Sequence, residues 1–167
     1  MLTDLLVSLR LAQPQDEWFL FQVYAATRAD EMALVPWTAE QQQAFLHMQF
    51  NAQRQSYALD YPDAAWQIIV KAEVPIGRLI VDRAADKILL MDIALLPEHR
   101  NHGIGTALIR ELMAEAQRTG KPLHLHVEPF NPAFKLYERF GFVKVGEAGI
   151  YWELAWFPGG DAKRDVA

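Results

Sequence analysis

A turn with two glycines lies in the second half of the 167-residue chain, between a strand-like stretch and a long amphipathic stretch. Its pattern is Arg100-x-x-Gly103-x-Gly105. A turn from a strand into a helix offers free backbone N–H groups, and the helix dipole adds partial positive charge. Arg100 supplies a full charge, and the glycines have no side chain to hold a ligand away from the backbone. This chemistry predicts a site for a phosphate or pyrophosphate group.

Two other phosphate-binding patterns fit this turn poorly. The nicotinamide-binding pattern G-x-G-x-x-G needs a third glycine where this chain has Leu108, and it follows the first strand of a βαβ unit. A P-loop needs Gly-Lys followed by Ser or Thr, which the sequence does not contain. Both patterns are therefore disfavoured.

A second stretch about thirty residues further on sharpens the prediction. It reads Asn131-Pro-Ala-Phe-Lys-Leu-Tyr137-Glu-Arg-Phe-Gly-Phe142. Together the two stretches resemble the GCN5-related N-acetyltransferase (GNAT) family. In that family an R/Q-x-x-G-x-G/A turn holds the pyrophosphate of acetyl-CoA, and an N…LYE-x-x-GF segment follows. The resemblance is dense over residues 88–145 and is little more than element order before Gln67.

The resemblance implies acetyl-CoA as the co-substrate and a set of residues that bind it. The turn would hold the pyrophosphate, and main-chain groups before it would pair with the acetyl carbonyl and the pantetheine amides. Asn131 is expected to contact the pantetheine arm, although a helix N-cap with Pro132 at the first helical position also explains it. The implied cofactor-binding residues are Ile93, Ala94, Leu95, Arg100, Asn101, His102, Gly103, Ile104, Gly105, Thr106, Asn131 and Tyr137.

Three residues are candidates for proton transfer. Within the LYE-x-x-GF pattern, the Tyr137 hydroxyl is implied to protonate the departing CoA thiolate, although a buried core tyrosine is the ordinary alternative. Asp92 and Glu128 are candidate bases for the amine by location, and each can also be an ordinary strand or loop carboxylate. His124 and His126 lie on one face of a strand and could also serve, but histidines with a structural role are expected there more often than catalytic ones.

The acceptor site is less defined. In relatives it draws on the first two helices and their connection. Glu31 could attract a cationic acceptor, whereas Arg28 could hold a carboxylate, and the sequence does not choose. His99 and His102 sit in the turn, where they could contact phosphate, and the spacing of the histidines predicts no metal site. The residues of interest for the acceptor are Tyr24, Arg28, Glu31, Met32, Trp37 and Tyr57.

Hydrophobic periodicity predicts an α/β (mixed α+β) fold in the order β-α-α-β-β-β-α-β-α-β-β. The resemblance implies the same order, that of a GNAT-like fold. The sheet is expected to be mixed and mostly antiparallel, with about seven strands and helices on both faces. A capping box, Thr38 to Gln41, should open a helix with Phe45, Met48 and Ala52 on one side. A turn is expected at 74–76. The predicted strands are 7–11, 66–71, 77–83, 88–96, 123–127, 142–145 and 150–156, and the other helices 16–27, 104–117 and 131–141.

Size and composition predict one domain, residues 1–157, followed by a flexible tail at 158–167. Hydrophobic residues make up 51% of the chain and charged residues 22%, as in ordinary soluble enzymes. The net charge of −5 argues against a nucleic-acid partner. No cysteine is present, which excludes a thiolate nucleophile or disulfide within the chain, and no apolar run is long enough for a membrane helix. A cytoplasmic location is the default expectation.

These features predict an N-acetyltransferase that moves the acetyl group of acetyl-CoA to a primary amine on a small molecule or peptide. Because the chain has no cysteine, direct attack by the amine in a ternary complex is expected. The alternatives are a non-catalytic acyl-CoA-binding sensor or regulatory module, and a protein-interaction domain that uses the fold as a scaffold. The closing hairpin strands could pair between chains, so a homodimer is one expected assembly.

Overall fold

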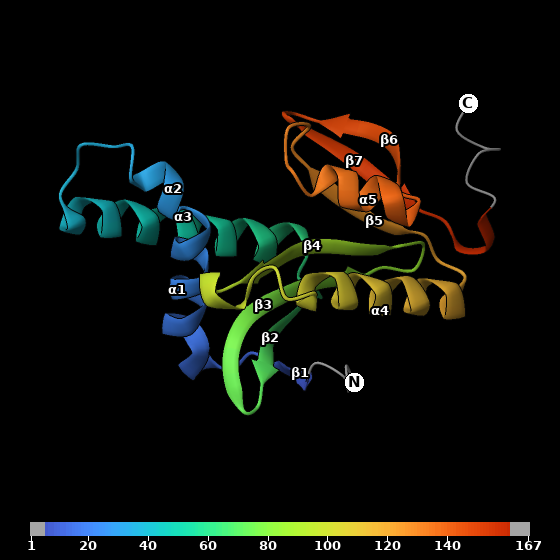
Figure 1. Cartoon of the computed structure of the whole chain (residues 1–167), viewed down its shortest axis with the longest axis horizontal. Helices are drawn as coiled ribbons and strands as arrows, with labels where there is room; N and C mark the ends of the chain where they lie inside the picture. The colour runs from blue at the N-terminus through green and yellow to red at the C-terminus, as the bar shows by residue number, and fades with distance from the viewer. Residues whose placement is uncertain (1–5, 161–167) are drawn as a thin grey trace. The chain divides into compact units, whose positions relative to one another are not determined.

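The computed structural model describes residues 6–160. Over these residues the chain forms one seven-stranded mixed sheet in the order β1-β2-β3-β4-β5-β7-β6 (Figure 1). Strands β4 and β5 run parallel, and β5, β7 and β6 pair antiparallel. The elements are β1 (Val7–Leu11), α1 (Glu17–Thr27), α2 (Ala29–Met32), α3 (Ala39–Asp60), β2 (Ala65–Lys71), β3 (Val74–Arg83), β4 (Ile88–Leu95), α4 (Ile104–Thr119), β5 (Leu123–Val127), α5 (Phe134–Phe140), β6 (Val143–Ala148) and β7 (Tyr151–Trp156).

The described residues divide into two compact units, and β3 and β4 each contribute residues to both. The N-terminal unit comprises 6–80 and 92–105 of the described residues, and the C-terminal unit comprises 81–91 and 106–160. The α/β class, the mixed sheet of seven strands and the order of the elements confirm the fold predicted from the sequence. The short helix α2 is an addition that sequence periodicity did not indicate.

Helix α3 begins where its capping box predicts. The Thr38 hydroxyl accepts from the Gln41 amide N–H at 3.2 Å, and the Gln41 side chain accepts from the Thr38 N–H at 2.9 Å. The side that carries Phe45, Met48 and Ala52 is not the buried side, because Met48 is 61% exposed while Leu46 and Phe50 are buried. Leu46 and Phe50 lie one helical turn apart on α3. They form a core cluster together with four other buried residues, Leu20, Phe21, Tyr24 and Ile68.

The link between β1 and α1 is fixed by one carboxylate. Arg10 donates to both oxygens of Asp16 at 2.7 and 2.8 Å, and the Gln13 amide N–H donates to Asp16 at 2.7 Å. The side-chain hydrogen bond from Arg10 dominates and, against the opposing effect of burial, lowers the pKa of Asp16 to about 2. The ionised carboxylate therefore holds the first strand to the first helix.

The turn between β2 and β3 does not lie at residues 74–76. The chain reverses at Ala72 and Glu73, which have φ of 48° and 69°. Val74 already belongs to β3. Both turn residues have positive φ although neither is glycine. The sequence therefore has no glycine or proline at the turn itself to indicate it. The expected turn was therefore placed two residues too late.

In the C-terminal unit, apolar faces organise the elements as the periodicity predicts. Leu123, Leu125 and Val127 are the buried positions of β5, alternating with His124 and His126. Helix α4 buries an apolar stripe made up of Ile104, Leu108, Ile109, Leu112 and Ala116. The predicted closing hairpin is present as β6 and β7 (red in Figure 1), with paired residues from Val143↔Ala155 to Ala148↔Tyr151.

One boundary prediction near the C-terminus differs from the structure. Helix α5 begins at Phe134, so Asn131 is not its N-cap; the Asn131 side-chain oxygen instead accepts from the Ala133 N–H at 2.9 Å. The end of α5 at Gly141, with φ of 95°, is confirmed. Of the predicted tail, residues 158–160 form a short 3₁₀ turn, in which the Gly159 N–H donates to Gln117 at 3.2 Å. The remainder of the tail, 161–167, lies outside the described residues.

Candidate acyl-CoA-binding and catalytic site

The predicted phosphate-binding turn joins β4 to α4 through a loop with unusual backbone angles. After β4, a 3₁₀ turn over Pro97–His99 leads into a loop in which Asn101 and Gly103 have φ of 62° and 80°. Helix α4 then begins at Ile104. The first N–H groups of a helix have no partner within the helix. The loop therefore presents free donors at the positive end of a 16-residue helix.

Arg100 does more than add charge to this loop. Its Nε donates to the Leu95 carbonyl at 3.0 Å, and its Nη2 donates to the Ala26 carbonyl at 3.4 Å. The side chain thus joins the loop to the end of β4 and to α1 within the N-terminal unit. Because the guanidinium is engaged with backbone carbonyls, its first role here is to fix the shape of the loop.

The two glycines of the motif differ in what they require. Gly103 has positive φ, so any other L-residue is strained there. Gly105 has no such φ, and a Cβ built on it meets no heavy atom within 4 Å among the described residues. Neither local conformation nor packing within the described chain therefore explains a glycine at 105. Alanine would also favour a helix at this position more than glycine does.

The end of β4 is held at close range by Gly77, a residue that sequence reasoning did not single out. A Cβ on Gly77 would lie 2.3 Å from the Ala94 carbonyl oxygen. The Leu96 N–H donates to the Ile76 carbonyl at 2.9 Å beside it. The backbone of Ile93, Ala94 and Leu95, predicted to pair with the cofactor, is thus set by a glycine on the neighbouring strand. A strand glycine of this kind is the signal that could have revealed the contact.

Asp92 on β4 is paired with Arg78 on β3. The Arg78 Nε donates to Asp92 Oδ2 at 2.5 Å, and Nη2 donates to the Gln53 side chain at 3.1 Å. Arg78 is 2% exposed, and its guanidinium lies 5.7 Å from the Tyr24 ring centroid. One oxygen of the candidate base is therefore committed to a buried cation. This pairing depends on strand register, which sequence patterns did not fix.

In the C-terminal unit, Tyr137 is a buried residue of α5. Its ring packs edge-on against Phe142 with centroids 5.7 Å apart. The Phe142 N–H donates to the Tyr137 carbonyl at 3.0 Å, which closes the helix beside Gly141. The segment that carries the candidate acid is thus fixed by its own sequence motif.

The other candidate base, Glu128, follows β5 and is exposed. Within residues 6–160 its carboxylate makes no hydrogen bond or ion pair, and its backbone carbonyl accepts from the Asn131 N–H at 3.0 Å. The side chain of His124 is already paired, since its Nδ1 lies 2.8 Å from Glu153 Oε1 on β7. That hydrogen bond is the main cause that lowers the pKa of Glu153, opposed by burial and assisted by Lys87.

The residues predicted for the acceptor mostly contact one another or the core. Tyr24 is buried and its hydroxyl lies 3.4 Å from the Gln49 side chain, while Arg28 pairs with Glu31 at 3.4 Å. Trp37 packs edge-on against Phe45. The Tyr57 ring lies 6.0 Å from that of Trp66. Because Arg28 and Glu31 pair with each other, the structure favours neither a cationic acceptor at Glu31 nor an acceptor carboxylate at Arg28.

No cluster of three or more His, Asp or Glu side chains suited to a metal ion occurs within 6–160. In the same range, no helix combines the length and apolar character needed to cross a membrane.

The end of β4, a loop with two residues of positive φ and the start of α4 follow one another in the chain. The model of the Acetyltransferase (GNAT) family matches residues 20–142, which is well over half of the chain. The chain therefore belongs to the GNAT acetyltransferase family.

Solved structures share the fold of this chain, and two curated proteins share part of its sequence. The PaiA N-acetyltransferase of Thermoplasma acidophilum, solved with coenzyme A, has a TM-score of 0.67 at 17% identity, covering 90% of this chain and 98% of that one. The ribosomal-protein-S18-alanine N-acetyltransferase of Escherichia coli has a TM-score of 0.62 at 17% identity, covering 96% and 99%. Mouse and human cysteine-rich protein 2-binding proteins are 34% and 33% identical over 88 residues, or 52% of this chain. The match spans only 11% of their length.

Proposed function

We propose that this protein is an N-acetyltransferase that moves the acetyl group of acetyl-CoA to a primary amine by direct attack in a ternary complex. The observation that carries the proposal is the loop after β4, with its two left-handed residues and its unexplained glycine at 105. A similar structure solved with coenzyme A supports the choice of cofactor.

In the proposed cofactor site, the backbone N–H groups from Asn101 to Thr106 bind the pyrophosphate, and Arg100 holds the loop in shape. The absence of a side chain at Gly105 lets phosphate oxygens approach the backbone. The main chain of Ile93, Ala94 and Leu95 pairs with the pantetheine amides. Asn131 contributes a side-chain amide to the same arm. Exposed positions such as His102 add donors at the rim of the loop.

In the proposed reaction, the amine nitrogen forms a bond to the thioester carbonyl carbon. The backbone N–H groups at the end of β4 stabilise the oxyanion of the tetrahedral intermediate. The carbon–sulfur bond then breaks, and the Tyr137 hydroxyl gives its proton to the departing thiolate. The products are an acetylated amine and coenzyme A.

The amine must lose a proton, and two carboxylates are proposed to accept it. Freeing an amine with a pKa near 10.4 at pH 7 costs about 4–5 kcal/mol, so a positioned base contributes to the rate. Glu128 is exposed and unpaired among the described residues, whereas Asp92 already shares an oxygen with Arg78. We therefore favour Glu128 as the proton acceptor and keep Asp92 as the alternative.

The experiment has two stages. Calorimetry with acetyl-CoA should give micromolar binding, which tests the cofactor. A screen of small amines, amino acids and peptide N-termini for acetyl-CoA-dependent CoA release should then identify an acceptor class. Binding without release for any amine would favour the sensor module, and no binding of acetyl-CoA or longer acyl-CoAs would contradict the proposal.

A further inference from the structure

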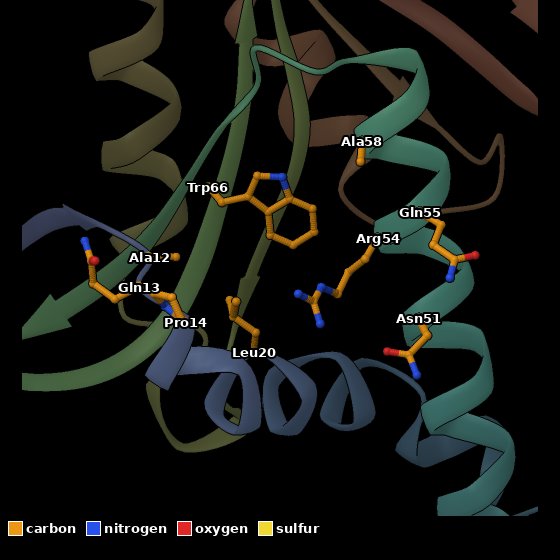
Figure 2. A pocket seen from close by; sticks show the side chains of 9 residues that line it. All are labelled: Ala12, Gln13, Pro14, Leu20, Asn51, Arg54, Gln55, Ala58 and Trp66. Carbon is orange, nitrogen blue, oxygen red and sulfur yellow. The ribbon is translucent and has the colours of Figure 1, made fainter.

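The N-terminal unit contains a groove that the proposed acetyl transfer does not use. It has a volume of about 700 Å³ and is formed by four stretches: the connection from β1 into α1, the first turn of α1, the second half of α3, and the start of β2 (Figure 2). None of the predicted cofactor, catalytic or acceptor residues lines it. Its lining residues are Ala12, Gln13, Pro14, Leu20, Asn51, Arg54, Gln55, Ala58 and Trp66.

One wall of the groove is flat and apolar. The Trp66 indole faces the groove from β2, and the buried Leu20 lies below it (Figure 2). Tyr57, whose ring centroid is 6.0 Å from that of Trp66, supports the indole within the N-terminal unit. Indole faces bind other flat rings well, because offset or edge-on stacking adds to the burial of apolar surface.

The opposite wall carries one cation with spare donors. Arg54 extends from α3 into the groove (Figure 2), and its guanidinium lies 5.4 Å from the Phe50 ring centroid. Its Nη1 is paired with Glu17, while Nε and Nη2 make no hydrogen bond within residues 6–160. Asn51 and Gln55, on either side of Arg54 in sequence, add carboxamides to the same wall.

The ion pair that now engages Arg54 is easily exchanged. The Glu17 side chain is 60% exposed and is bound through a single oxygen. Exposed pairs of this kind contribute only about 0–1 kcal/mol, whereas a carboxylate held by both arms of a guanidinium is bound more strongly. A ligand carboxylate could therefore replace Glu17 without a large cost.

We propose that this groove binds a small aryl carboxylate, with its ring against Trp66 and Leu20 and its carboxylate on Arg54 in place of Glu17. The volume falls in the range of about 300–1,000 Å³ that suits a small molecule. The site is independent of the acetyl-transfer proposal, since it shares no residue with it.

The test uses the full chain, with phenylacetate as the probe. Binding is monitored through the indole N–H signal of Trp66 in NMR spectra. Phenylacetate should shift this signal with millimolar affinity. Phenylacetamide, which has the same ring without the charge, should bind about ten times more weakly. Arg54→Gln should weaken phenylacetate binding about tenfold, and Glu17→Gln should strengthen it severalfold, because the competing carboxylate is gone.

The opposite effects of the two variants guard against misfolding as an explanation. Arg54→Lys should restore part of the affinity lost in Arg54→Gln. Equal binding of phenylacetate and phenylacetamide would overturn the proposal, as would an unchanged Trp66 signal up to about 10 mM probe. Shifts centred instead on Trp18 and His47, which line a separate groove beside Glu17, would also overturn it. Acetyl-CoA affinity should be unaltered in all three variants.

Discussion

The two motif segments of this chain, residues 93–106 and 131–142, are built on different principles. In the first, the sequence acts through the backbone: Gly77 admits the Ala94 carbonyl, Arg100 binds main-chain carbonyls, and Gly103 adopts positive φ. In the second, a short helix carries one buried tyrosine, Tyr137, and the helix ends at Gly141. Changes of shape should therefore affect the first segment, and changes of chemistry the second.

The largest effect is expected from Gly77→Ala, which tests the shape-dependent segment. The added methyl would lie 2.3 Å from a backbone oxygen, so the strands must separate. We expect a loss of about 3 kcal/mol of stability together with weaker acetyl-CoA binding, measured by urea unfolding and calorimetry. Gly146→Ala is the matched control, since its Cβ would make only an ordinary 3.5 Å contact with Glu153. Equal effects of the two variants would contradict the assignment.

Tyr137→Phe tests the segment that depends on chemistry. Removing only the hydroxyl should lower kcat about 100-fold with acetyl-CoA affinity nearly unchanged, because the thiolate loses its proton donor. Steady-state kinetics with an identified amine would measure both quantities. Tyr61→Phe, the same change at the end of α3, should leave kcat as it is. An unaltered kcat in Tyr137→Phe would remove the proposed acid.

Substitutions of the two candidate bases, Glu128 and Asp92, should affect different quantities, the first the kinetics and the second the stability. Glu128→Gln is expected to lower kcat/KM about tenfold at neutral pH and to flatten the acidic limb of its pH profile. Asp92→Asn should mainly lower thermal stability, because it leaves the buried Arg78 without its anion. If the pH profile changes in Asp92→Asn and stays intact in Glu128→Gln, the assignment is reversed.

A smaller effect is expected at Asp16, which belongs to neither segment and gives a baseline for stability alone. Its pKa is about 2 when folded, below its ordinary 3.8, so the ionised form stabilises the fold above pH 4. That contribution should fade as pH falls from about 4 to 2. At pH 7, Asp16→Asn should lower Tm by a few degrees without changing acetyl-CoA affinity. A Tm difference that persists at pH 2 would contradict this origin.

Sequence patterns predicted the parts of the fold whose signals are local. Strand β5 follows from the alternation of Leu123, Leu125 and Val127, and the start of α3 from its capping box. The buried side of α3 could not be identified from the sequence. The helix has 22 residues, most of them polar, and only Leu46 and Phe50 among them are buried. Its apolar residues therefore do not mark a single face.

The candidate site was predictable where it depends on residue type and not where it depends on register. The turn at 100–105 and the segment at 131–142 carry their own motifs. The pairing of Arg78 with Asp92 and the approach of Gly77 to Ala94 arise between strands, and no local pattern fixes which residues meet. The motif likewise could not predict that Arg100 binds the carbonyls of Leu95 and Ala26, which lie 5 and 74 residues away in sequence.

The most direct test of the account is the acetyl-CoA affinity of Gly105→Ala, measured by calorimetry beside its unfolding temperature. Because nothing in the described chain contacts a Cβ there, the variant should fold with equal or higher stability. A pyrophosphate seated against that backbone should nevertheless bind about ten times more weakly or worse. Unchanged affinity in a stably folded Gly105→Ala protein would contradict the placement of the pyrophosphate at this loop.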